Sequence, residues 1–272
     1  MPVFPEIFGW RFLFESAETN WLDMRQYWFH LAILGGLAAC LATEGKLRMG
    51  VAAPMPNPPG ATVKGTVKFK GTVPKPSRID MSADAKCVQA RPGGGLTEEI
   101  VADGGGLQNV IVYVSQGLGD AKFDPPKEPA VIDQKGCMYQ PHVVTLRANQ
   151  ELKVVNSDNT THNIHPIPNN NRELNQSQPP GVPFSMTFAR EEIAIPVNCN
   201  IHPWMHSYIA VFKHPYFAVT GKAGGFEIPN LPPGTYTITA WHEKLGSSFQ
   251  KITVGESETK TLEFVFKAQP GF

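Results

Sequence analysis

The sequence has few charged residues and no excess of either sign. Asp, Glu, Lys and Arg make up 18% of the 272 residues, and 24 basic side chains balance 24 acidic ones. An average protein has about 25% of such residues. A neutral chain has no net field that holds a polyanion through counterion release. Nucleic acid is therefore not an expected partner.

Cysteine is also scarce, and no long helical period is present. Four cysteines are too few for a small disulfide-framework protein, so each is interpreted from its own neighbours. The chain instead holds 25 glycines and 25 prolines, which separate short β-branched and aromatic runs such as TVKGTVKFKG at 62–71 and LQNVIVYVS at 107–115. This pattern predicts an all-β protein.

The N-terminal segment is typical of an exported protein. Read from Met24, the apolar stretch 27–39 has signal-peptide length and is too short for a comfortable membrane span. The string LAAC that ends at Cys40 resembles a bacterial lipobox, which makes Cys40 a lipidation candidate; a retained, uncleaved anchor is the alternative. We expect a signal or lipoprotein segment at 1–43 and a proline-rich linker at 44–60. The prediction is a bacterial protein in the periplasm or at the cell surface, held at the membrane by this anchor or lipid.

The most informative motif is VNCNIHPWMHSYIAV at 197–211. In it, Cys199, His202 and Met205 have the spacing C-x2-H-x2-M between two expected strands, and Pro203 argues against a helix. A second imidazole is available from His162, in VVNSDNTTHNIH at 154–165. Two imidazoles and a thiolate with a weak axial thioether are the ligands of a blue-copper electron-transfer site. Zinc held by Cys199, His202 and His206 is the alternative, and it leaves Met205 unused.

The strings HNIH and CNIHPWM resemble the copper loops of cupredoxins, most closely those of the amicyanin and plastocyanin-like group. The resemblance implies a Greek-key β-sandwich, which we expect at 61–214, with one type 1 copper ion. It also implies four ligands, namely His162, Cys199, His202 and the axial Met205.

Three further roles follow from the same resemblance. Asn163 ties the two ligand loops together by hydrogen bonds, and His202 is the ligand nearest solvent. Pro203 and Trp204 then belong to an apolar patch that docks a redox partner protein. The insertion at 120–140 and the added C-terminal region depart from the family pattern, so the identity of the partner does not carry over.

The C-terminal region has a different character. GGFEIPNLPPGTYTITAWHE at 224–243 resembles carboxypeptidase regulatory-like modules and the fibronectin-like middle domain of rhamnogalacturonan lyases, which predicts a second, smaller β-sandwich at 215–272. GTVKFKG at 65–71 also resembles the start of such a module, so the module could borrow that strand, with the copper domain inserted. Trp241-His242-Glu243 lacks a second histidine at metalloprotease spacing and is interpreted as structural.

Two cysteines and two histidines remain. In an exported protein, a disulfide between Cys87 and Cys137 is the plain interpretation, with free thiols as the alternative. Cys137 and His142 leave a second metal site conceivable, although two candidate ligands do not make a site. His165 is interpreted as a loop histidine near the first site.

Three functions are compatible with these features. The first is a membrane-tethered blue-copper electron carrier, and the second is a copper carrier or sensor without fast electron transfer. The third is a structural or carbohydrate-binding surface lipoprotein. An oxidase or nitrite reductase needs additional copper centres with paired histidines, and no such motif is evident, so we expect a non-enzymatic protein.

Overall fold

The computed structural model describes residues 59–268. The predicted signal segment, all but the last two residues of the predicted linker, and Cys40 lie outside the described residues. No helix between residues 59 and 268 is both long enough and apolar enough to cross a membrane. Nearly all regular structure in this range is strand, which confirms the predicted all-β class.

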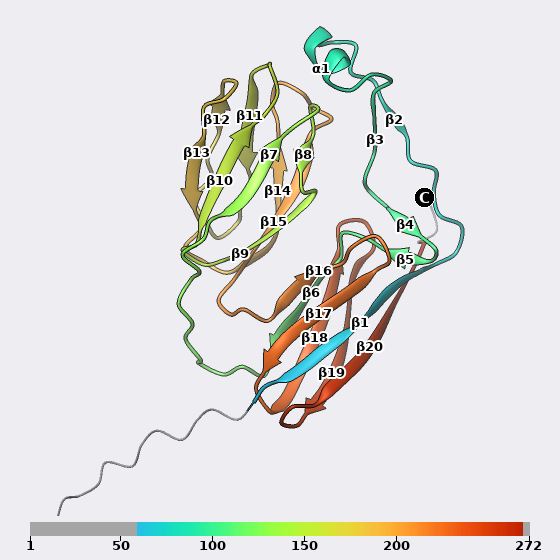
Figure 1. The fold of residues 1–272 in the computed structure, drawn as a ribbon, viewed down its shortest axis with the longest axis vertical. Helices are drawn as coiled ribbons and strands as arrows, with labels where there is room; N and C mark the ends of the chain where they lie inside the picture. The colour runs from blue at the N-terminus through green and yellow to red at the C-terminus, as the bar shows by residue number, and fades with distance from the viewer. Residues whose placement is uncertain (1–58, 269–272) are drawn as a thin grey trace, which may run out of the picture. The chain divides into compact units, whose positions relative to one another are not determined.

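Strands β7 to β15 form one sandwich (Figure 1), which we name the copper-loop sandwich after the cupredoxin copper loops that its sequence resembles. One sheet has the order β13-β10-β7-β8 and the other β12-β11-β14-β15-β9. The bounds in the first sheet are β7 Ala130–Gln134, β8 Tyr139–Gln140, β10 Glu151–Asn156 and β13 Phe184–Thr187. Those in the second are β9 Val143–Arg147, β11 His162–Pro166, β12 Gln176–Gln178, β14 Glu192–Asn198 and β15 His206–Phe212.

The core of the copper-loop sandwich explains why these segments become strands. Apolar side chains alternate with polar ones in β10, where Leu152 and Val154 are fully buried and Glu151 and Lys153 are exposed. Such a period of two places one face of a strand on the core. Cys199 and Met205 belong to the same buried cluster, so the predicted ligand loop is anchored in this core.

A second sandwich combines strands from both ends of the described chain. One sheet has the order β17-β1-β5-β4 with β20 also paired to β1, and the other has the order β16-β6-β18-β19. The bounds in the first sheet are β1 Ala61–Lys70, β4 Ala102–Asp103, β5 Gly106–Leu107, β17 Gly225–Leu231 and β20 Thr259–Lys267. Those in the second are β6 Ile111–Gln116, β16 Phe217–Val219, β18 Gly234–His242 and β19 Gly246–Val254.

The predicted boundary of the copper domain at 61–214 differs from this arrangement. β1 pairs with β20 in parallel from Thr62 to Lys70 and also pairs antiparallel with β17, while β6 pairs with β18. The reason is burial, because Val63 and Val67 of β1 pack in the same core cluster as Phe226 and Phe264. The C-terminal module thus includes N-terminal strands, and the copper-loop sandwich is inserted in the chain between its N-terminal and C-terminal parts. This is the arrangement that the resemblance of GTVKFKG to the start of such a module suggested.

Close packing of β1 against β20 depends on Gly65. A Cβ atom at this position would lie 1.9 Å from the carbonyl oxygen of Leu262. Any side chain there would force the two strands apart. The glycine therefore fixes how near the borrowed strand can lie to its C-terminal partner.

The segment between β1 and β6 carries a short helix that is tied to the copper-loop sandwich. Helix α1 (Ala85–Ala90) is capped by Asp84, whose Oδ1 accepts from the backbone N–H groups of Lys86 and Cys87. Cys87 forms a disulfide with Cys137, with Cα atoms 5.5 Å apart and a sequence separation of 50. The two-stranded pair β2 (Arg78–Ile79) and β3 (Gly95–Leu96) flanks this helix in sequence.

A buried carboxylate holds a loop of the copper-loop sandwich. Glu192, 6% exposed, accepts hydrogen bonds from the backbone N–H groups of Asn169 and Asn170 and from the side-chain amide of Asn171. Burial alone disfavours the charged carboxylate, but these hydrogen bonds outweigh it and lower the pKa of Glu192. The loop at 169–171 therefore depends on an ionised Glu192.

A small third cluster joins the two sandwiches. Ile111 of β6 packs with Val143 of β9 and Phe212 of β15. The rings of Tyr208 and Trp241 lie next to them with centroids 5.4 Å apart. The end of β18 is thereby held against the start of β15.

Candidate metal centre

Three predicted ligands come from two strand ends of the copper-loop sandwich. His162 is the first residue of β11, while Cys199 and His202 lie in the loop between β14 and β15. Two backbone hydrogen bonds close this loop, from Met205 N–H to the His202 carbonyl at 2.9 Å and from Cys199 N–H to the Met205 carbonyl at 3.2 Å. The loop is thus a tight turn whose side chains can converge without helical spacing.

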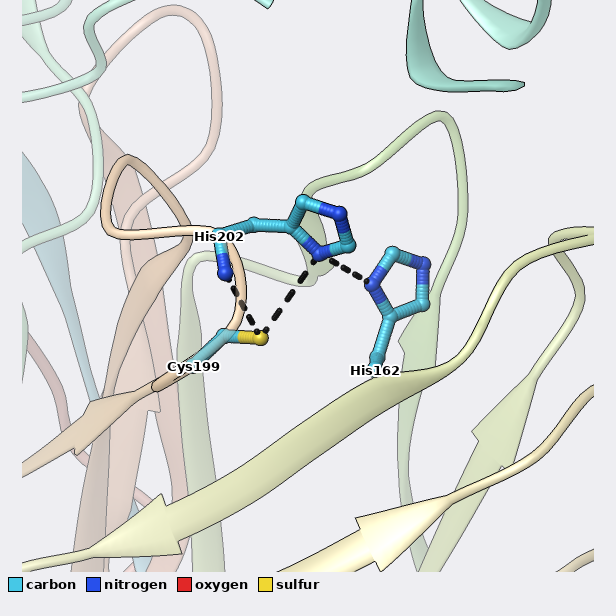
Figure 2. Close-up of side chains that lie close together, drawn as sticks. All are labelled: His162, Cys199 and His202. Carbon is cyan, nitrogen blue, oxygen red and sulfur yellow. Dashed lines mark hydrogen bonds between the residues drawn. The ribbon is translucent and has the colours of Figure 1, made fainter. Parts of the chain in front are cut away.

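The three side chains converge on one point (Figure 2). The Nδ1 atoms of His162 and His202 lie 3.0 Å apart, and the Cys199 Sγ lies 3.8 Å from Nδ1 of His202. The backbone N–H of His202 also donates to Sγ at 3.4 Å. One ligand atom from each residue lies within 4.8 Å of the others.

Both imidazoles are fixed by a carboxylate on the opposite side of the ring. Nε2 of His162 lies 2.8 Å from Asp158 Oδ2, and Nε2 of His202 lies 3.0 Å from Asp84 Oδ2. We assign the ring proton to each Nε2, because a carboxylate only accepts hydrogen bonds. Each Nδ1 lone pair then faces Sγ and the other ring. Metal-bound histidines usually have this second contact to a carboxylate or carbonyl.

The two carboxylates are themselves anchored. Asp158 accepts from the backbone N–H groups of Gly136 and Cys137 at 2.6 and 2.8 Å. Burial opposes its ionisation, but the hydrogen bonds from His162 and these two N–H groups lower its pKa. Burial likewise opposes ionisation of Asp84, while hydrogen bonds from His202 and the start of α1 lower its pKa to about 2. Both groups are therefore negative at neutral pH.

The environment of Cys199 favours its thiolate form. Burial raises the pKa of this thiol, but its contact with the His162 ring and hydrogen bonds from the backbone N–H groups of His202 and Ile201 outweigh burial and lower it. Among residues 59–268, Cys199 is the only free cysteine. The thiolate is the form of cysteine that binds metals.

The donor set fits copper. His162 and Met205 are fully buried, and Cys199 and His202 are each 2% exposed. The structure thus offers two imidazole nitrogens and one sulfur in a buried cluster, with the thioether of Met205 buried in the same core. Soft sulfur and imidazole ligands suit copper.

His202 is more enclosed than expected of the ligand nearest solvent. Its ring lies beneath Asp84 and Trp204, and the residue is 2% exposed, as is Cys199, whereas His162 and Met205 are fully buried. The physical cause is the disulfide between Cys87 and Cys137, which holds the α1 segment at the copper-loop sandwich.

Sequence reasoning missed both carboxylates. Asp158 precedes His162 by four residues, so an acidic residue in the loop before the ligand was a usable signal. Asp84 lies 118 residues from His202 and gave no local signal.

The remaining predicted residues lie around the centre. Asn163 Oδ1 accepts from the backbone N–H of Asn200 at 3.0 Å, so β11 is linked to the ligand loop. Pro203 is exposed and Trp204 is half-buried, with its ring centroid 5.1 Å from that of His202. Trp204 also donates its indole N–H to the Cys137 carbonyl at 3.1 Å.

Two alternative metal sets are not brought together. His206 lies with His142 and Glu243, away from the group of Cys199 and His202, so the zinc set that included His206 is not formed. Cys137 is in the disulfide and offers no thiolate to pair with His142. His165 contacts Glu173 and Asn200, in agreement with a loop histidine.

Comparisons with known proteins identify two kinds of similarity. A family model for polysaccharide lyase family 4, domain II, matches residues 204–262. A search of curated protein sequences finds no match.

Solved structures show the second similarity. A Cu-containing nitrite reductase from Thermus scotoductus is 19% identical over 36% of this chain, with a TM-score of 0.30; the match covers 25% of the reductase. A purple cupredoxin from Nitrosopumilus maritimus is 22% identical over 30% of this chain and 98% of its own length, with a TM-score of 0.27. A reduced amicyanin variant is 16% identical over 37% of this chain and 97% of its own length, with a TM-score of 0.29. The chain is thus similar to cupredoxins over about a third of its length.

Proposed function

We propose that the protein is a type 1 copper protein that carries single electrons and catalyses no reaction of its own. The observation that carries this proposal is the orientation of His162 and His202, whose Nδ1 atoms face each other and the Cys199 sulfur. His162, Cys199 and His202 would hold copper, with Met205 as the axial ligand.

Burial of the ligands favours electron transfer over copper delivery. A copper carrier must release its ion, and all four ligand residues here are at most 2% exposed. Asp84 and Asp158 hold the outer nitrogens of both imidazoles, which restrains rotation of the rings. Bound copper supplies a one-electron couple, and a restrained ligand set keeps the reorganisation between its two states small. These features support an electron carrier over a copper carrier or sensor.

Trp204 offers a path between the buried ligands and the surface. Its ring lies against the ring of His202 and is itself half-buried, while Ile201 and Pro203 beside it are exposed. We propose that this apolar surface docks a redox partner protein. Pro203 and Trp204 are the two residues that the sequence also assigned to this docking surface.

Export remains part of the proposal. A disulfide such as Cys87–Cys137 persists in oxidising compartments and is rare in the cytosol. It supports the periplasmic or cell-surface location, with membrane attachment through the N-terminal segment.

The decisive experiment is a copper titration of the full chain. We expect an intense blue thiolate-to-copper absorption band whose intensity accounts for one Cu(II) per chain, recorded together with the total copper content by mass spectrometry. Cys199→Ser should abolish the band. His165→Gln is the matched control, because His165 is a nearby histidine that contacts a carboxylate without joining the ligand group.

Failure has a clear form. Absence of the band, or a band that survives Cys199→Ser, contradicts the type 1 assignment. If the band is present, copper release to an excess of a Cu(I) chelator separates the functions. Slow release with fast reduction by small redox proteins supports the electron carrier, and rapid release supports the copper carrier.

A further inference from the structure

A second group of metal-binding side chains lies where the two sandwiches meet. His142 lies between β8 and β9, His206 begins β15, and Glu243 follows the last residue of β18. One ligand atom from each of the three lies within 4.8 Å of the others. Tetrahedral ligands around an ion at about 2.1 Å lie roughly 3.4 Å apart, so small movements bring all three into bonding distance.

The nitrogen atoms of this group are oriented for an ion. Nε2 of His142 lies 2.5 Å from Glu243 Oε1. Nδ1 of His206 lies 3.2 Å from the Trp204 carbonyl, so this nitrogen is the donor and Nε2 of His206 is left as the acceptor. Nδ1 of His142 is 3.7 Å from a carboxylate oxygen of Glu98. For His206, this is again the pattern of a metal-bound imidazole with an outer polar partner, whereas Nδ1 of His142 is too far from Glu98 for a hydrogen bond.

Burial makes the group costly without an ion. The side chains of His142 and Glu243 are 3% and 4% exposed, and Nδ1 of His142 is buried without a hydrogen-bond partner. Glu98 and Glu243 put two carboxylates near His142, and the charge of Glu99 is balanced by Lys244 at 2.6 Å. The excess of negative charge favours a cation.

A cavity beside the group leaves room for a further ligand. It has a volume of about 280 Å³, and its lining includes His206, Tyr208, Glu243 and Pro203. Sites with two histidines, one glutamate and one open position bind divalent transition ions with a water molecule in the fourth place.

We propose that His142, His206 and Glu243 form a second metal site, which binds one divalent transition ion of the zinc class and joins the two sandwiches. It shares no ligand with the copper centre. His142 and His206 come from the copper-loop sandwich and Glu243 from the other one, so the ion links the inserted domain to its host module.

The test uses Zn²⁺ and the full chain carrying Cys199→Ser, which removes the thiolate of the first site. Competition with a chromophoric chelator should give one tightly bound Zn²⁺ per chain. Adding Glu243→Gln or His206→Gln should weaken this binding at least tenfold. Adding His165→Gln should leave the affinity unchanged, because His165 and Glu173 form an exposed histidine–carboxylate pair outside the group.

A second readout guards against misfolded variants. Zn²⁺ should raise the melting temperature of the Cys199→Ser chain and not that of the Glu243→Gln chain, while the two apo proteins show the same cooperative unfolding. Equal affinity with and without Glu243 overturns the proposal. So does zinc binding that is lost with His162→Gln, since the ion would then occupy the first site. The blue band of the wild-type chain tests the proposed function separately.

Discussion

Removing the disulfide should both destabilise the protein and uncover the proposed copper centre. The perturbation is the double substitution of Cys87 and Cys137 by alanine, which leaves Cys199 as the only cysteine among the described residues. The bond closes a loop with a sequence separation of 50. The loop-closure entropy of a chain of that length corresponds to about 4 kcal/mol of the free energy of unfolding at 25 °C. In a protein of this size the melting temperature falls by roughly 2–4 °C for each kcal/mol.

The assay follows unfolding and the copper site in the same sample. We expect a melting temperature lower by about 8–16 °C. The freed α1 segment should also take Asp84 away from His202, so that a Cu(I) chelator removes copper from the variant faster than from the wild type. Chelation is measured in native buffer, well below the melting temperature, so that unfolding does not contribute.

Two results would refute this reasoning. If the free energy of unfolding of the double variant is lower than that of the wild type by less than about 1 kcal/mol, the disulfide does not restrain the unfolded state. If the melting temperature falls as expected but the chelator removes copper at the wild-type rate, then Asp84 keeps its contact with His202 without the disulfide. The α1 segment would then be held by its own contacts.

Three other predictions concern single residues. Asp84→Asn keeps a side chain that can cap α1 but removes the negative charge behind His202, which stabilises Cu(II) more than Cu(I). We therefore expect a higher reduction potential in a redox titration, by about 40 mV for each kcal/mol of Cu(II) stabilisation that is lost. Gly65→Ala should lower the free energy of unfolding by roughly 1–3 kcal/mol through a clash with β20, whereas Gly221→Ala, with no atom within 4 Å of its new methyl group, should be nearly neutral in urea denaturation. The pKa of Glu192 is lower in the folded protein than its unfolded value of 4.5, so its charge stabilises the fold fully above pH 4.5. This stabilisation is lost as the pH falls through the pKa of the folded state. Glu192→Gln should therefore make the free energy of unfolding less dependent on pH in the acid range.

Local patterns gave the ligands because the ligand loop is short. Cys199, His202 and Met205 lie within seven residues, and a proline between them excludes a helix, so the spacing alone brings them to one turn. His162 was found because it follows a strand in a loop rich in turn formers. The carboxylate of Asp84 was missed, since it lies 118 residues from His202 in the sequence and no local pattern brings the two together.

The domain boundary was misplaced for a similar reason. β1 alternates small or apolar residues with polar ones, which predicts a strand but not its partner. Only the pairing with β20, nearly 200 residues later in the chain, shows that it belongs to the C-terminal module. Non-local strand pairing of this kind follows from the shape of the whole core, and a period of two carries no information on it.

The same period of two explains why His206 does not join His162, Cys199 and His202. In C-x2-H-x2-M-H, His206 follows Met205 directly, and adjacent residues of an extended chain point to opposite sides. Met205 enters the core of the copper-loop sandwich, and His206 turns toward His142 and Glu243 at the junction. One stretch of backbone therefore serves two donor groups without sharing a side chain. A shift of β15 by one residue would exchange their directions and destroy both groups, so the register of β15 against β9 and β14 positions both sites.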